Sequence, residues 1–113
     1  MANIQEVLAR VFVDDLDAAI PFYEKLAEQP AQRFGFRDVQ LARVGSFMLL
    51  AGNTEAYRNR VATLLVKDLR PVLEELDVSG GEVIEGPAPA PNGARLIARH
   101  PDGSVFEYIE TGA

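Results

Sequence analysis

The sequence has no cysteine and no tryptophan, and it has one histidine, His100. Without cysteine there is no disulfide, no thiolate nucleophile and no zinc–thiolate site. Basic residues are few: 11 Lys and Arg stand against 17 Asp and Glu, and the formal net charge is −6. No basic patch supports nucleic-acid binding, and no run approaches the roughly 18 apolar residues of a membrane span. These absences exclude several classes of function and leave a non-membrane, thiol-independent protein as the expectation.

The 113 residues are 48% hydrophobic and 25% charged, which is typical of a globular protein. This length suits one domain with a substantial core. The first residues lack the basic and apolar regions of a signal peptide, so we expect a cytoplasmic location.

The closing stretch of the sequence gives the strongest local signal. Two apolar runs, Ala94–Ala98 and Ser104–Ile109, flank a His-Pro-Asp-Gly turn, and this arrangement predicts a β-hairpin. The second run carries a carboxylate, Glu107, in the middle of an apolar strand. An acid in that position needs a partner, a ligand, a metal or a route to water.

The remaining elements follow from periodicity and turn residues. Asp14 and Asp15 offer an N-cap for a helix over about Asp17–Leu26, and Asp68 offers one for a helix over about Pro71–Val78. The segment Gly86–Gly93 is too rich in proline for a central strand, so we expect a loop. Further strands are expected at Val7–Val13, Gln32–Phe36, Val39–Val44, Ser46–Ala51, Arg60–Val66 and Glu82–Ile84.

The predicted order is β-α-β-β-β, twice. Val13-Asp-Asp-Leu16 matches Val66-Lys-Asp-Leu69 at an offset of 53 (66 − 13), and Gly45–Leu50 matches Gly103–Tyr108 at an offset of 58 (103 − 45). Matches that fall in the same order within each half indicate an internal repeat. We therefore expect a single domain over residues 1–113, with one module at about 1–53 and the other at about 60–113.

The motifs at the two ends, Val-Asp-Asp-Leu-Asp-Ala-Ala-Ile-Pro-Phe-Tyr at 13–23 and His-Pro-Asp-Gly-Ser-Val-Phe-Glu-Tyr-Ile-Glu at 100–110, resemble the vicinal oxygen chelate superfamily, which includes glyoxalases, bleomycin-resistance proteins and dioxygenases. The resemblance implies an α+β fold of tandem βαβββ modules. Each module would form a curved mixed sheet with its helix on the outer face, and the sheets would enclose a concave cup that holds the ligand. It also implies a homodimer.

Catalytic members of that superfamily bind one divalent metal through side chains of the first and last strand of each half, commonly His and Glu. By the resemblance, these positions are Leu8, Leu49, Val61 and Glu107 here. One carboxylate does not hold a catalytic metal, which usually needs three protein ligands. We therefore predict a metal-free protein without a cofactor.

Strand alternation predicts which side chains line the cup. The lining is apolar and partly aromatic, with Arg10 and Glu107 as its charges, and two interpretations of these charges stay open: an ion pair in the wall, or contacts with the ligand. The predicted ligand-binding residues are Leu8, Arg10, Phe12, Phe47, Leu49, Val61, Thr63 and Glu107.

The leading hypothesis is a metal-independent protein that binds and sequesters a small apolar or aromatic molecule, such as an antibiotic, in pockets of a homodimer. The first alternative is an enzyme: a lyase or isomerase with Glu107 as general base, because a carboxylate on an apolar wall suits proton transfer, or a dioxygenase-like member with its metal ligands elsewhere. The second is an interaction module whose cup is filled by a neighbouring chain.

Overall fold

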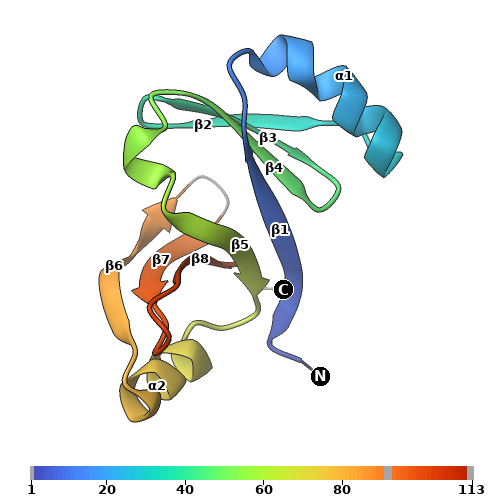
Figure 1. Cartoon of the computed structure of the whole chain (residues 1–113). Coiled ribbons are helices and arrows are strands. Elements are labelled where there is room, and N and C mark those ends of the chain that lie inside the picture. The colour runs from blue at the N-terminus through green and yellow to red at the C-terminus, as the bar shows by residue number, and fades with distance from the viewer. Residues whose placement is uncertain (1, 91–92, 112–113) are drawn as a thin grey trace. The chain divides into compact units, whose positions relative to one another are not determined.

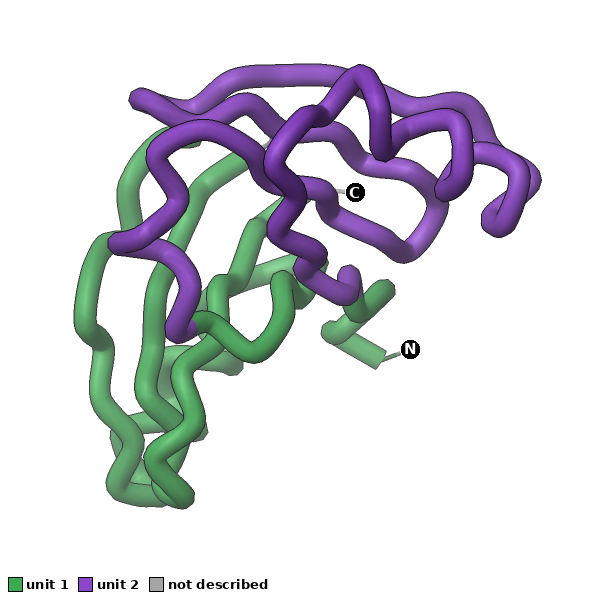
Figure 2. The backbone as a smooth tube through the Cα atoms, turned by 45° about the horizontal axis from the view of Figure 1, so that its top comes forward, with its two compact units in different colours: residues 1–7, 60–113 green, residues 8–59 purple. Residues whose placement is uncertain are grey.

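The computed structural model describes residues 2–90 and 93–111, which form two compact units (Figure 2). Unit 2 is Leu8–Asn59, and unit 1 joins the residues up to Val7 with those from Arg60 onward. The helices and strands, labelled in Figure 1, are β1 (Ile4–Phe12), α1 (Leu16–Ala27), β2 (Gln32–Phe36), β3 (Val39–Val44), β4 (Phe47–Gly52), β5 (Arg60–Val66), α2 (Arg70–Ser79), β6 (Glu82–Ala90), β7 (Gly93–Arg99) and β8 (Val105–Glu110). A 3-10 turn (Glu55–Tyr57) lies between β4 and β5.

In unit 2 the strands hydrogen-bond in the order β2-β3-β4-β1. The pairs β2–β3 and β3–β4 are antiparallel, whereas β1 runs parallel to β4. Helix α1 covers one face of this sheet, against β3 and β4. The core between them contains Leu16, Ile20, Ala42, Val44, Leu49 and Ala51.

Helix α1 begins where the sequence predicts. The Asp15 carboxylate accepts hydrogen bonds from the backbone N–H groups of Asp17 (3.0 Å) and Ala18 (3.4 Å), which otherwise lack a partner at a helix N-terminus. Leu16 and Ile20 are buried on one side of the helix. Burial of this apolar stripe sets which face of α1 meets the sheet.

In unit 1 the order is β5-β8-β7-β6, with β5 parallel to β8 and the other pairs antiparallel. Helix α2 covers one face through Leu76, and the cluster under it includes Leu64, Val66, Leu69, Leu96, Ala98 and Tyr108. Gly80 ends the helix in a left-handed conformation with φ 87°. The four strands of each unit therefore pair in a mixed pattern, and each unit carries one helix.

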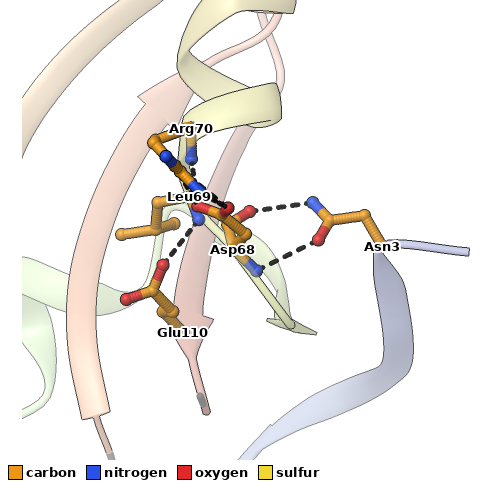
Figure 3. Close-up of polar contacts among 5 residues, drawn as sticks. All are labelled: Asn3, Asp68, Leu69, Arg70 and Glu110. Atoms are coloured by element: carbon orange, nitrogen blue, oxygen red, sulfur yellow. Dashed lines mark hydrogen bonds and ion pairs between the residues drawn. The ribbon is translucent and has the colours of Figure 1, made fainter. Parts of the chain in front are cut away.

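The N-terminal residues are tied into unit 1 by the side chain of Asn3 (Figure 3). Its amide Nδ2 donates to the carbonyl of Asp68 at 2.9 Å, and its Oδ1 accepts from the N–H of Asp68 at 3.0 Å. The Asn3 carbonyl also accepts from the N–H of Lys67 at 3.0 Å. The side chain thus satisfies both backbone groups of Asp68, as a neighbouring strand would.

The start of α2 is capped beside this contact. The Glu110 carboxylate accepts from the N–H of Leu69 at 2.8 Å, and that of Asp68 accepts from the N–H of Arg70 at 2.9 Å. The side-chain hydrogen bond from Arg70, more than any other interaction, holds the pKa of Asp68 below its usual value. The N-cap residue of α2 is Leu69, one residue after the predicted Asp68, although the Asp68 carboxylate still accepts the N–H of Arg70, where the helix begins.

The α+β class and the tandem βαβββ order are confirmed. One local prediction is wrong: β6 continues through the proline-rich segment to Ala90 instead of ending at Ile84. Because β6 lies at the edge of its sheet, Pro87 and Pro89 remove no hydrogen bond from a central strand. The end of the predicted loop, residues 91–92, lies outside the described residues. No helix in the described part of the chain is long and apolar enough to cross a membrane.

Candidate functional site

Glu107 lies on the face of the unit 1 sheet that α2 does not cover, and both of its carboxylate oxygens accept hydrogen bonds. Thr63 Oγ1 donates to Oε1 at 2.7 Å, and Arg95 Nε donates to Oε2 at 3.0 Å. Thr63 and Glu107 are direct partners in the β5–β8 register. The carboxylate predicted to need a partner therefore has two within its own unit.

Arg95 connects Glu107 to a second acid. Its Nη1 donates to Glu85 at 2.7 Å, and Arg60 Nη2 lies 3.9 Å from the other oxygen of Glu85. Arg95 is only 5% exposed. Burial alone lowers the pKa of its guanidinium, but the hydrogen bonds and charges of Glu85 and Glu107 outweigh this and raise the pKa above its usual value. We call Arg60, Thr63, Glu85, Arg95 and Glu107 the ion-pair face; its formal charges balance.

A bulge in β5 brings Arg60 to this face. Arg60 is in register with Val105 and Thr63 with Glu107, so β5 uses three residues where β8 uses two. Simple alternation therefore does not apply to Val61, whose side chain is 58% exposed. The sequence offers no signal for this extra residue, because β5 is apolar on both sides of it.

In unit 2 the predicted orientation of Phe47 and Leu49 is wrong. Both pack in the core under α1, where Leu49 is 0% exposed and Phe47 lies edge-on to Tyr23 with ring centroids 5.0 Å apart. The error arises because the offset predicted between the last strands of the two halves is short by one residue. Met48 pairs with Arg10 as Glu107 pairs with Thr63, so the last strands match at an offset of 59 (107 − 48) rather than 58.

The residues on the face of unit 2 opposite α1 follow from the strand register, because directly paired residues point to the same side of a sheet. One row across the sheet is Arg10–Met48–Arg43–Gln32, and the next row is Phe12–Leu50–Leu41–Phe34. We call these eight residues the arginine face.

Three of the predicted lining residues, Leu8, Arg10 and Phe12, belong to the unit 2 portion of β1. Leu8 is fully buried. Phe12 carries the guanidinium of Arg58 over its ring, with Cζ 4.8 Å from the centroid. Arg43, which the sequence reasoning missed, donates from Nε to the carbonyl of Gly45 at 3.1 Å.

The metal positions of the superfamily do not fit a metal in this chain. Met48 takes the place assigned to Leu49, and neither Leu8 nor Val61 has a ligand atom. Both oxygens of Glu107 are engaged by Thr63 and Arg95. Within residues 2–90 and 93–111, no group of three or more His, Cys, Asp and Glu residues is arranged to hold a metal ion.

His100 is packed rather than solvated. Its ring stacks on Phe106 with centroids 4.3 Å apart, and its Nε2 lies 2.6 Å from the hydroxyl of Tyr108. Burial raises the pKa of Tyr108, so this hydroxyl keeps its proton at neutral pH. Both residues line a groove of about 510 Å³ beside α2, together with Ala2, Asn3, Ile4, Pro71, Val72, Glu75, Leu76, Ser79 and Pro101.

Arg95 is the main residue of the ion-pair face that sequence reasoning missed. It interrupts the apolar run Ala94–Ala98, as Glu107 interrupts the next strand. Two opposite charges inside the two strands of one predicted hairpin are a usable signal, because an apolar strand holds a charge only with a partner.

No protein-family model matches the sequence, and no curated protein does. Solved structures do. An uncharacterized protein from Methanosarcina mazei is 40% identical and has a TM-score of 0.89, over 96% of this chain and 94% of that one. Methylmalonyl-CoA epimerase from Mycobacterium tuberculosis is 19% identical, with a TM-score of 0.65 over 96% and 89%. The Streptomyces coelicolor epimerase is 16% identical, with a TM-score of 0.70 over 98% of each chain.

The two epimerases share the fold with this chain, and at these identities the likeness shows the fold alone. Paired βαβββ modules of this order define a vicinal oxygen chelate fold. The archaeal relative matches nearly the whole chain at 40% identity. The chain has the vicinal oxygen chelate fold, and it belongs to the same family as the archaeal protein.

Proposed function

We propose that this protein is a metal-independent small-molecule-binding member of the superfamily, which sequesters an apolar or aromatic compound as a homodimer. The observation that carries the proposal is the state of the four metal positions. Three of them hold Leu8, Met48 and Val61, and the fourth holds a carboxylate already bonded to Arg95 and Thr63. A donor set of this kind supports binding rather than metal-assisted chemistry.

The composition of the arginine face also supports binding. Its residues are mainly apolar and aromatic with a few polar groups, which is the usual composition of a ligand site, although Met48, Leu50 and Leu41 are buried. The resemblance to bleomycin-resistance members makes antibiotics one class of candidate compound.

A general-base role for Glu107 is not favoured. A base must reach the proton that it abstracts, whereas each oxygen of Glu107 already accepts a hydrogen bond within unit 1. If the chain is an epimerase or lyase that uses this residue, Glu107→Gln abolishes turnover. Under the binding proposal, no turnover depends on it.

Two measurements test the proposal. In thermal unfolding, we expect no change of midpoint with Mn²⁺, Co²⁺, Ni²⁺ or Zn²⁺, or after chelation, because a ligand of the folded state alone raises the midpoint by mass action. In fluorescence titration, we expect N-phenylnaphthylamine, a neutral aromatic probe, to bind saturably. A midpoint raised by one stoichiometric metal, or no saturable probe binding, would overturn the proposal.

The homodimer is part of the same proposal and has its own test. Light scattering after size exclusion should give twice the chain mass of 12.4 kDa. A mass of 12.4 kDa at micromolar concentration would contradict it.

A further inference from the structure

We infer that the groove beside α2 in unit 1 is a binding site for a small, neutral aromatic compound that carries a hydroxyl group. The rings of the compound lie in the apolar part of the groove, and its hydroxyl lies against His100 and Tyr108. This inference rests on the proposed function and adds to it a site and a chemical class of ligand.

Three parts of unit 1 contribute to the groove, which has a volume of about 510 Å³. They are the N-terminal residues 2–4, one side of α2, and the turn at His100 and Pro101. Sites for small molecules usually have volumes of roughly 300–1,000 Å³. The groove is therefore large enough for a compound of two or three rings.

Hydrogen bonds hold residues 2–4 against the segment that leads into α2. The side chain of Asn3 bonds to both backbone groups of Asp68 (Figure 3). The carbonyl of Asn3 accepts from the N–H of Lys67. The groove is thus formed without a ligand, which spares a bound compound the cost of ordering its walls.

Most of the lining is apolar. Leu76 and Tyr108 are only 7% and 6% exposed, so they form the floor of the groove. The other apolar lining residues are Ala2, Ile4, Pro71, Val72 and Pro101. An aromatic ring system gains free energy by burying its faces against such a surface.

The imidazole of His100 and the hydroxyl of Tyr108, 2.6 Å apart, give the groove a polar end. If the hydroxyl donates to Nε2 of a neutral imidazole, the Nδ1–H remains as a donor and the phenol oxygen as an acceptor. If Nε2–H donates instead, Nδ1 remains as an acceptor and the tyrosine O–H as a donor. Within the described residues, neither side chain makes a second hydrogen bond. A ligand hydroxyl, which both donates and accepts, fits the pair in either tautomer.

The charges at the groove disfavour an anion. Among the described residues that line it there is no lysine or arginine, whereas Glu75 of α2 brings a carboxylate. This carboxylate accepts a hydrogen bond from Ser79 Oγ on the same side of the helix. A carboxylate or phosphate on the ligand would meet this negative charge without a cation to balance it, so a neutral compound fits better.

The experiment compares two probes that differ by one hydroxyl group, naphthalene and 2-naphthol. Equilibrium dialysis against the full chain at neutral pH gives both dissociation constants. We expect 2-naphthol to bind saturably at one site per chain. Water solvates the two probes differently, so the quantity compared between variants is the ratio of the naphthalene constant to the 2-naphthol constant, in which that difference cancels.

The polar pair is tested with the double variant His100→Phe/Tyr108→Phe. It keeps both rings and the stack on Phe106 but removes the polar atoms, whereas either single variant leaves a donor and an acceptor on the other ring. The ratio should fall about tenfold, the effect of one or two neutral hydrogen bonds. Tyr23→Phe in unit 2 is the matched control and should leave the ratio unchanged, because Tyr23 packs on Phe47 away from the groove lining.

The place of binding is tested with two adjacent residues of α2. Ser79 lines the groove, whereas Val78 is 77% exposed and does not line it. Ser79→Trp puts an indole into the groove and should weaken both probes at least tenfold, while Val78→Trp should change them by less than about twofold. Circular dichroism checks that each variant is folded, and light scattering should give the same mass for both.

The outcomes separate this inference from the proposed function. If N-phenylnaphthylamine binds and 2-naphthol does not, the proposed function stands and the inference is wrong. If none of the probes binds, the proposed function is wrong as well. An unchanged ratio in the double variant, or equal weakening by Ser79→Trp and Val78→Trp, overturns the inference. If Ser79→Trp alone changes the mass, the groove is an interface between two copies of the chain, and the inference is likewise wrong.

Discussion

The two units have the same strand topology and treat charge in opposite ways. In unit 1 the acid Glu107 lies on the face that α2 does not cover, and Arg95 and Thr63 of the same sheet donate hydrogen bonds to it. In unit 2 the matching position is Met48, and arginines stand on both sides of it. A buried charge needs a partner, and the charged side chains of the ion-pair face in unit 1 bond to one another. In unit 2 Arg43 instead donates from Nε to the carbonyl of Gly45 at 3.1 Å.

The helix-covered faces differ as well. Tyr108 of β8 is matched in unit 2 by Leu49, one residue after Met48. Leu49 is simply buried, whereas Tyr108 brings a hydroxyl under α2 and bonds to His100. Unit 1 is therefore the more polar of the two on both of its faces.

The largest expected effect comes from making unit 1 resemble unit 2. Glu107→Met leaves the buried Arg95 with one carboxylate fewer, and we expect the free energy of unfolding to fall by about 3 kcal/mol. Urea unfolding measures it. Met48→Leu in unit 2 is the control and should cost less than about 1.5 kcal/mol. Equal losses in the two variants would contradict the contrast between the faces.

The second prediction concerns the N-terminal residues, which the side chain of Asn3 attaches to unit 1. Asn3→Ala removes both side-chain hydrogen bonds to Asp68 and should cost about 1–2 kcal/mol. Hydrogen exchange of the Asp68 amide, which donates to Asn3, should speed up in this variant. Unchanged exchange would show that Asn3 does not hold the segment.

A smaller effect is expected at Thr63, the unit 1 counterpart of Arg10. Thr63→Val keeps the shape and removes the O–H donor to Glu107, so we expect a loss of about 1 kcal/mol by urea unfolding. In the Glu107→Met background the same change should cost much less, because the acceptor is gone. A double-mutant cycle gives this difference directly, and additive losses would contradict the hydrogen bond between Thr63 and Glu107.

The smallest effect is confined to alkaline pH. Burial raises the pKa of Tyr108 above its usual value of 10.0. The unfolded chain therefore loses this proton first, and the stabilisation present below pH 10 declines as the pH rises further. Tyr108→Phe should remove this decline of the free energy of unfolding at alkaline pH. Its counterpart Leu49 has no titratable group and contributes no such decline. An identical alkaline slope in the variant would rule out Tyr108 as its source.

The sequence was sufficient for the order of elements and for most strand positions, because period-two and helical patterns are clear outside β4 and β6. It failed at β4, where Phe47, Met48, Leu49 and Leu50 are all apolar and alternation gives no information about the face. Only the register with β1 resolves it. Strand pairing likewise determines the bulge beside Val61 and the partners of Glu107. The sequence does show the charge of Arg95 within an apolar strand.

The bond between Arg95 and Glu107 also constrains how this chain can change over evolutionary time. To become a metal ligand, Glu107 would first have to be released from Arg95. Replacing Arg95 alone leaves Glu85 and Glu107 without their shared cation, and that intermediate is less stable than the starting protein. Loss of this ion pair is therefore a destabilising first step in any change of the role of Glu107.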